Sequence, residues 1–225
     1  MSQGKRIFID CGGHDGCSVV QFLSGRPDFS CVTFEPNEVM SPYYRFLPTR
    51  LVKKAVSTHD GTVEFIVDPL DGDGSSILEG KDVVYDGSLA NTECPRVVVG
   101  CVDLSSFVKA HVRPEDYLVL KIDVEGAEYG ILEKMLQDGT VSLIDEFYAE
   151  FHWEKCGVSQ AVHDQLVAKL QQHFEVIDWD AGALSVHGKG WKSAVRRAAM
   201  VSWIWIRRVL SGAAFRPHAV ATAAL

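Results

Sequence analysis

The segment of residues 7–16, Ile-Phe-Ile-Asp-Cys-Gly-Gly-His-Asp-Gly, constrains the fold more than any other part of this chain of 225 residues. Its first three residues are apolar, as in a buried strand, and Asp10 ends that run. The loop that follows is rich in glycine and leads into a predicted helix, with Gly12, Gly13 and Gly16. A strand, a glycine loop and a helix N-terminus together bring backbone N–H groups close to a bound ligand.

A second acid supports a nucleotide-like ligand. Glu35 ends the next apolar run, residues 31–34, about 20 residues beyond the loop. At this spacing a carboxylate suits the two hydroxyls of a ribose. The loop alone is weak evidence, but the loop and the second acid together favour nucleotide binding.

Apolar strands and helical segments alternate along the chain, which predicts βαβ units and a mostly parallel sheet. We therefore expect an α/β fold of the Rossmann-like kind, with a seven-stranded sheet and helices on both faces. The expected strands are residues 6–10, 30–34, 51–57, 62–67, 96–102, 117–122 and 143–151, with 51–57 and 62–67 joined as a hairpin and a second hairpin closing the fold over 174–187.

A second motif carries a resemblance to a known family. Residues 118–128 read Leu-Val-Leu-Lys-Ile-Asp-Val-Glu-Gly-Ala-Glu. This run resembles the strand-four motif of the FkbM-type S-adenosylmethionine-dependent methyltransferases. Segments resembling the family's cofactor loop, second-strand acid, third strand and middle section occur in the same order, at residues 9–16, 34–36, 54–65 and 74–104. The chain departs from the family in having His14-Asp15 in the loop, where an Ala-Asn-like pair is more usual.

The resemblance implies a class I methyltransferase fold and S-adenosylmethionine as cofactor. We expect Gly12, Gly13 and Gly16 to let the backbone approach the methionine end of the cofactor, and Asp10 to orient its ammonium. Glu35 would accept hydrogen bonds from the ribose. The residues that end the third strand would border the adenine ring, namely Val56 and Ser57.

Acidic and imidazole groups cluster where two central strands end. Asp123 follows the strand 117–122, and Glu150 and His152 follow the next one. Ligands of open α/β sheets bind at these carboxyl ends. His152 is the candidate general base for a hydroxyl acceptor. Alternatively, Asp123, Glu150 and His152 bind Mg²⁺, although no metal is assigned here.

Composition limits the partners. All 30 acidic residues precede residue 181, and seven of the 22 basic residues follow residue 188, so residues 1–188 carry a net charge of −15. An acidic body argues against nucleic-acid binding.

The six cysteines contain no Cys-x-x-Cys pair, and the first residues do not resemble a signal peptide, so we expect reduced thiols and a cytoplasmic location. The expected substrate is a hydroxyl of a small molecule, sugar or natural product.

The C-terminal tail differs from the body. We divide the chain into a methyltransferase domain, residues 1–188, and a basic, tryptophan-rich tail, residues 189–225. Residues 198–206 are apolar apart from Ser202, with arginine pairs on both sides, and are too short to cross a bilayer. The segment 189–210 is either a terminal element docked on the body or a peripheral membrane anchor, and we expect disorder over residues 211–225.

Two other functions compete with methyl transfer. An NAD- or nucleotide-binding oxidoreductase would use the same glycine loop, although the loop is not Gly-x-Gly-x-x-Gly. A non-catalytic binding module with the same fold, held at a membrane by its tail, is the second alternative. The sequence does not predict the oligomeric state.

Overall fold

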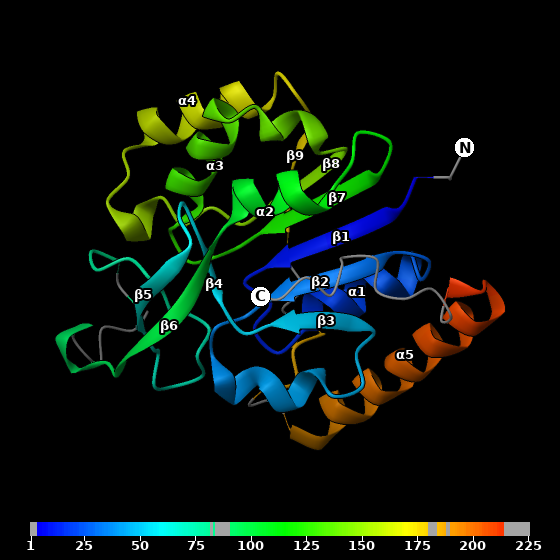
Figure 1. The fold of residues 1–225 in the computed structure, drawn as a ribbon. Coiled ribbons are helices and arrows are strands. Elements are labelled where there is room, and N and C mark those ends of the chain that lie inside the picture. The colour runs from blue at the N-terminus through cyan, green and yellow to red at the C-terminus, as the bar shows by residue number, and fades with distance from the viewer. Residues whose placement is uncertain (1–3, 82, 84–90, 180–183, 188–189, 214–225) are drawn as a thin grey trace.

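The computed structural model describes residues 4–213, except 82, 84–90, 180–183 and 188–189. A parallel sheet of six strands forms its centre, in the order β3-β2-β1-β7-β8-β9 (Figure 1). The strands are β1 Arg6–Cys11, β2 Ser30–Phe34, β3 Thr49–Val52, β7 Tyr117–Ile122, β8 Glu146–Ala149 and β9 Val176–Asp178. The strand order reverses between β1 and β7, which is where such sheets bind ligands. The predicted Rossmann-like α/β fold is thus confirmed.

A second, three-stranded sheet lies beside the first. It has the order β4-β6-β5, formed by β4 Ala55–Ser57, β5 Gly61–Ile66 and β6 Arg96–Asp103. β6 pairs parallel with β4 and antiparallel with β5. In Figure 1 this sheet extends away from the carboxyl ends of β1 and β2.

Two strand predictions were therefore wrong. The expected strand 51–57 is broken at Lys53 and Lys54, so that β3 belongs to the central sheet and β4 to the second sheet. β4 and β5 do not form a hairpin, because β6 lies between them. The single seven-stranded sheet is thus replaced, among the described residues, by sheets of six and three strands. At the other end of the chain, β9 pairs parallel with β8, and the expected second hairpin falls partly outside the described residues.

Helices cover both faces of the central sheet (Figure 1). On one face lie α2 Leu104–His111, α3 Glu128–Gln137 and α4 Gln160–Leu170, and on the other α1 Cys17–Gly25 and α5 Gly190–Leu210. Short 3₁₀ helices connect these elements: η1 Glu38–Tyr44, η2 Asn91–Glu93, η3 Thr140–Leu143 and η4 Glu154–Cys156. η1 contains Pro42.

The two central strands contribute to both cores because successive side chains point to opposite faces. Ile7 and Ile9 of β1 pack with α2 and α3, whereas Phe8 packs with α1. In β7, Leu118 and Val119 are divided between the two cores in the same way. All of these side chains are fully buried, and each contributes about 1.5–3 kcal/mol relative to an exposed position.

The tail forms a docked helix over most of its described length. α5 packs against α1, and its buried residues are Arg197, Ile204 and Arg208. This confirms the alternative in which the tail forms a terminal element docked on the body, because one face of α5 packs against it. Among the described residues, no helix has both the length and the apolar character needed to span a bilayer. The expected disorder of residues 211–225 lies mostly outside the described residues.

Candidate functional site

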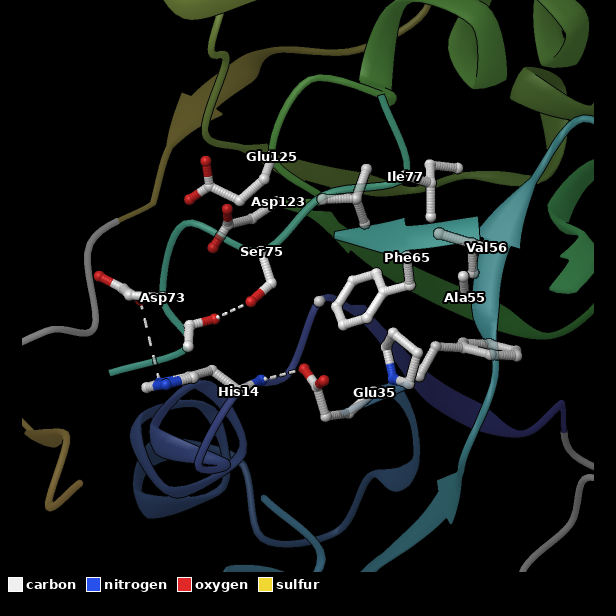
Figure 2. A pocket seen from close by; sticks show the side chains of 15 residues that line it. His14, Glu35, Ala55, Val56, Phe65, Asp73, Ser75, Ile77, Asp123 and Glu125 are labelled. Carbon is white, nitrogen blue, oxygen red and sulfur yellow. Dashed lines mark hydrogen bonds and ion pairs between the residues drawn. The ribbon is translucent and has the colours of Figure 1, made fainter. Parts of the chain in front are cut away.

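A cleft of about 580 Å³ opens at the carboxyl ends of β1, β2 and β7 (Figure 2). The second sheet closes one side of it through Ala55, Val56 and Phe65. The remaining lining residues come from the glycine loop, the end of β2, the segment after β5 and the end of β7: Gly12, His14, Phe34, Glu35, Pro36, Gly72, Asp73, Ser75, Ile77, Asp123, Val124 and Glu125. This is the position that the topology predicts for a ligand.

Glu35 fixes the glycine loop and faces the cleft. Its Oε2 accepts a hydrogen bond from the backbone N–H of His14 at 2.8 Å, and its Oε1 accepts one from Asn37 at 2.7 Å. Burial raises the pKa of Glu35 to about 7, although both backbone hydrogen bonds act in the opposite direction. A carboxylate has about four acceptor sites, so two remain for a ligand's hydroxyls.

The three loop glycines have different roles. Gly12 has a φ of 77°, and a Cβ there would lie 1.7 Å from the carbonyl oxygen of Asp123, so a side chain would push β1 away from β7. Gly13 lines a second hollow that is described below. Gly16 also has a positive φ, but its missing Cβ faces Leu47 at 2.5 Å rather than the cleft. The prediction that Gly16 contacts the cofactor is therefore not supported by its position, which is that of the N-cap of α1.

One end of the cleft is apolar. Ala55 and Val56 from β4 and Phe65 from β5 line it, as Figure 2 shows. Val56 thus lies where an adenine ring was expected. Ser57, the other predicted adenine neighbour, does not line the cleft, and its Oγ lies 3.3 Å from His59 Nδ1.

Asp10 lies beneath the loop rather than in either hollow. Its side chain is fully buried, with Oδ1 3.4 Å from the ammonium of Lys121. Lys121 also pairs with Asp123 at 3.0 Å and donates a hydrogen bond to the carbonyl oxygen of Gly12 at 2.7 Å. Burial alone would lower the pKa of Lys121, but the two carboxylates outweigh it and raise that pKa. The expectation that Asp10 orients the cofactor's ammonium stays a prediction. In this structure Asp10 pairs with Lys121, which ties the loop to β7.

His152 is buried within a group of carboxylates. Its Nδ1 lies 3.2 Å from Glu128, and its Nε2 lies 3.3 Å from Glu125, 3.6 Å from Glu150 and 4.0 Å from Asp123. Only 3% of His152 is exposed, and it lines neither hollow among the described residues. The structure thus brings together the predicted catalytic residues Asp123, Glu150 and His152, with His152 as their common neighbour.

The charges set the protonation of this group. Burial opposes the imidazolium, but hydrogen bonds and charge from Glu125, Glu128 and Glu150 outweigh it and raise the pKa of His152 to about 12. Burial raises the pKa of Asp123 to about 6, against the influence of Lys121. A protonated, buried imidazole has no lone pair for a substrate proton. This arrangement disagrees with the predicted general-base role of His152.

Glu125 is fixed in an unusual conformation. Its φ is 56°, and His14 has a φ of 44°; these are the non-glycine residues with positive φ in the described part of the chain. Both line the cleft. Glu125 is held by an ion pair with buried Lys81 and by a hydrogen bond from the Oγ of Ser76 to its carbonyl oxygen at 2.6 Å. Backbone strain of this kind gathers at functional sites.

A metal-binding set was the alternative to the base. Asp123, Glu128 and His152 offer ligand atoms that all lie within 4.8 Å of one another. The sequence predicted Glu150 as the third ligand of this set, whereas in the structure the third ligand atom comes from Glu128. Mg²⁺ prefers an all-oxygen shell, and the proton on His152 already supplies a cation to these carboxylates. The donor set does not favour Mg²⁺, and no metal is assigned.

A second hollow of about 800 Å³ adjoins the first and shares Gly12, His14, Asp73 and Asp123 with it. Its other walls come from the loop, α1, β7 and the C-terminal part of the chain: Gly13, Cys17, Ser18, Asp71, Lys121, Glu150, Trp179, Ser185 and His187. Asp123 therefore lies between the two hollows.

Several site residues were not found from the sequence. Phe65, Asp73 and Ile77 follow or end β5 and line the cleft, and buried Lys81 neutralises Glu125. The Gly74-Ser75-Ser76 segment did match the family's middle section, and Ser75 lines the cleft. Lys121 lies within the 118–128 motif that carries the resemblance to the family. That position was a sequence signal from which a role for Lys121 could have been predicted.

The sequence matches the profile of the methyltransferase FkbM domain over residues 10–179. This chain belongs to the FkbM methyltransferase family. The matched region contains the glycine loop, the 118–128 motif, the cleft and the carboxylates around His152, and it ends before α5. Methyltransferase function follows from this membership.

The other searches add little. No curated protein matches the chain significantly. Among solved structures, a xanthine dehydrogenase from Bacillus halodurans aligns with 95% of this chain and with 49% of its own length, about half, at 12% identity and a TM-score of 0.33. A likeness this weak carries no argument about fold or function.

Proposed function

We propose that this FkbM family member transfers a methyl group from S-adenosylmethionine to a hydroxyl of a small molecule, sugar or natural product. The observation that carries the cofactor assignment is Glu35, whose two anchored oxygens face a cleft with an apolar end. The ribose hydroxyls would donate to the two free acceptor sites of Glu35. The adenine would pack against Val56 and Phe65.

The methionine end would continue past Gly12 toward the second hollow. Gly13, Lys121 and Asp123 all line that hollow. The cofactor's ammonium is a cation, and Asp73, an acid that lines both hollows, suits it. S-adenosylmethionine supplies an activated methyl on a sulfonium, so the protein has mainly to position and deprotonate the acceptor.

We assign the acceptor's proton to Asp123 rather than to His152. Asp123 lies between the hollows, is oriented by Lys121 at 3.0 Å, and has its pKa raised to about 6 by burial. A base whose pKa lies near the working pH is the more effective one. Glu150, half-exposed and lining the second hollow, is placed to contact the acceptor. His152 is then a positioning residue that holds Glu125, Glu128 and Glu150 together.

Glu35→Gln should weaken S-adenosylhomocysteine binding by about 1.5–3 kcal/mol, because the uncharged amide loses a charge-assisted acceptor. Titration calorimetry measures this. The matched control is Glu38→Gln, since Glu38 lies in η1 with a side chain that is 81% exposed and pairs only with Lys53 at 3.8 Å. The control should bind as the wild type does. Equal affinities for all three proteins, each with an unchanged melting temperature, would remove Glu35 from the ribose site.

A further inference from the structure

Helix α5 is fastened to the body by its inner face. Arg208 donates hydrogen bonds to the carbonyl oxygens of Pro27 at 2.8 Å and Phe29 at 2.7 Å, and Arg197 pairs with Asp15 of the glycine loop at 3.4 Å. Ile204 is fully buried between these two arginines, against the core that contains α1. The helix is therefore held at a fixed orientation, with one face permanently turned away from the protein.

The outer face of α5 is unusually apolar. Seven of the fourteen exposed large hydrophobic side chains in the described part of the chain lie on this one helix. Their exposed fractions run from 40% for Trp205 to 81% for Leu210. The other five are Trp191, Val195, Trp203, Ile206 and Val209.

These side chains form one continuous face. At about 100° per residue, they fall within an arc of about 160° around the helix axis, and the helix is about 31 Å long. The smaller residues within the same arc include Ala198, Ala199 and Ser202, all exposed. An apolar face of this extent on a protein surface marks an interaction site.

The charge beside this face identifies the partner. Exposed Lys192 and Arg196 lie at one border of the apolar arc, and α5 contains no acidic residue. Arg207 lies beyond the same border, but its guanidinium donates a hydrogen bond to the carbonyl oxygen of Ser24 at 2.9 Å. The body of the protein has the opposite charge, with a net −15 over residues 1–188. An antiparallel two-fold dimer through this face would bring two copies of the same basic border together, which costs electrostatic energy. Anionic lipid headgroups complement a basic border, and tryptophan favours the headgroup level.

We infer that the outer face of α5 docks the enzyme on an anionic lipid surface, with the helix lying parallel to the membrane plane. The apolar side chains enter the headgroup and acyl boundary, and Lys192 and Arg196 contact anionic headgroups. This inference does not depend on the methyl-transfer reaction. It goes beyond the family's matched region, which ends at residue 179.

Co-sedimentation of the full chain with phosphatidylcholine vesicles, with and without phosphatidylserine, tests this docking. The wild type should bind the anionic vesicles and bind neutral ones much less. Lys192→Gln with Arg196→Gln should lower the partition coefficient about 25-fold, at about fivefold per basic residue. Ile206→Ser with Leu210→Ser should lower it by at least about tenfold.

The matched control is Val98→Ser, because Val98 is a 75% exposed apolar residue on β6, far from α5 in the sequence. It should bind anionic vesicles as the wild type does. Unchanged melting temperatures and S-adenosylhomocysteine affinities in all variants establish that they are folded. Failure of the wild type to bind anionic vesicles, or equal binding by all variants, overturns the inference. So does a wild-type dimer in sedimentation velocity that dissociates in the Ile206→Ser, Leu210→Ser variant, since a second copy would then cover the face.

Discussion

Lys121→Met should destabilise the protein by about 3–5 kcal/mol, the usual cost of removing one partner from a buried ion pair. The ammonium of Lys121 is fully buried between Asp10 and Asp123, and it also donates to the carbonyl oxygen of Gly12. Methionine fills a similar volume but leaves two buried carboxylates without their cation. Urea unfolding at neutral pH measures the change in the free energy of unfolding.

Lys169→Met provides the matched control. Lys169 lies on α4 with a side chain that is 56% exposed, and its Nζ is 3.8 Å from Glu133. Exposed pairs of this kind contribute less than about 1 kcal/mol. If the two variants lose the same free energy of unfolding, the buried network around Lys121 does not hold the loop to the sheet.

The wild-type protein should lose stability as the pH rises from 7.0 to 8.5, and His152→Gln should lose about 2 kcal/mol less over this range. Burial opposes the charge on His152, but Glu125 and its neighbours raise the pKa to about 12 in the folded state. An unfolded histidine has a pKa of about 6.5. The stabilisation is therefore complete below about pH 6.5 and is lost as the pH rises toward the folded pKa, at up to about 1.4 kcal/mol per pH unit.

Chemical unfolding at several pH values measures this difference. Burial also raises the pKa values of Cys11, Cys17 and Cys31, and these thiols add a similar slope at alkaline pH. Because they are present in both proteins, their contribution cancels in the comparison. Parallel stability curves for wild type and His152→Gln would mean that His152 is neutral in the folded protein, and would restore it as a candidate base.

The parts of the fold that the sequence predicted are those set by local pattern. The apolar residues 7–9 and 118–120 read as buried strands, because central parallel strands are apolar on both faces. Gly12 could be assigned to a tight loop because it follows an apolar strand and precedes a helix, and in the structure a side chain there would meet the backbone of Asp123. Glu35 could be predicted at this edge because it ends a strand beside such a loop, and it lines the cleft.

The parts that could not be predicted depend on register between distant segments. Lys121 is the register partner of Asp10 across β1 and β7, a pairing that joins residues 111 positions apart. The sequence pattern does not contain this register, so Asp10 appeared free for a ligand. Likewise, the 51–57 segment has apolar residues on both sides of Lys53 and Lys54 and therefore reads as one strand. In the structure β3 ends and β4 begins at these two lysines.

The sequence likewise does not predict which face of α5 packs against the body. Its apolar run and arginine pairs were visible in the sequence, and they led to a docked element and a membrane anchor as alternatives. The structure uses Arg197 and Arg208 on the inner face and leaves Trp191 and Trp203 outside, whereas the indole N–H of Trp205 donates a hydrogen bond to the carbonyl oxygen of Phe46. Buried arginines that hydrogen-bond to carbonyl oxygens of other segments are not distinguishable, by sequence, from exposed ones.

Parallel calorimetric titrations of the wild-type chain with S-adenosylhomocysteine and with NAD test the central claim most directly. Both ligands carry a ribose that can reach Glu35, but only the former has a methionine-derived end to pass Gly12 and Asp123. We predict one S-adenosylhomocysteine bound per chain, with a melting temperature that rises with ligand concentration, and no binding of NAD. Binding of NAD without S-adenosylhomocysteine would contradict the cofactor assignment, and binding of neither would contradict the cleft as a nucleoside site.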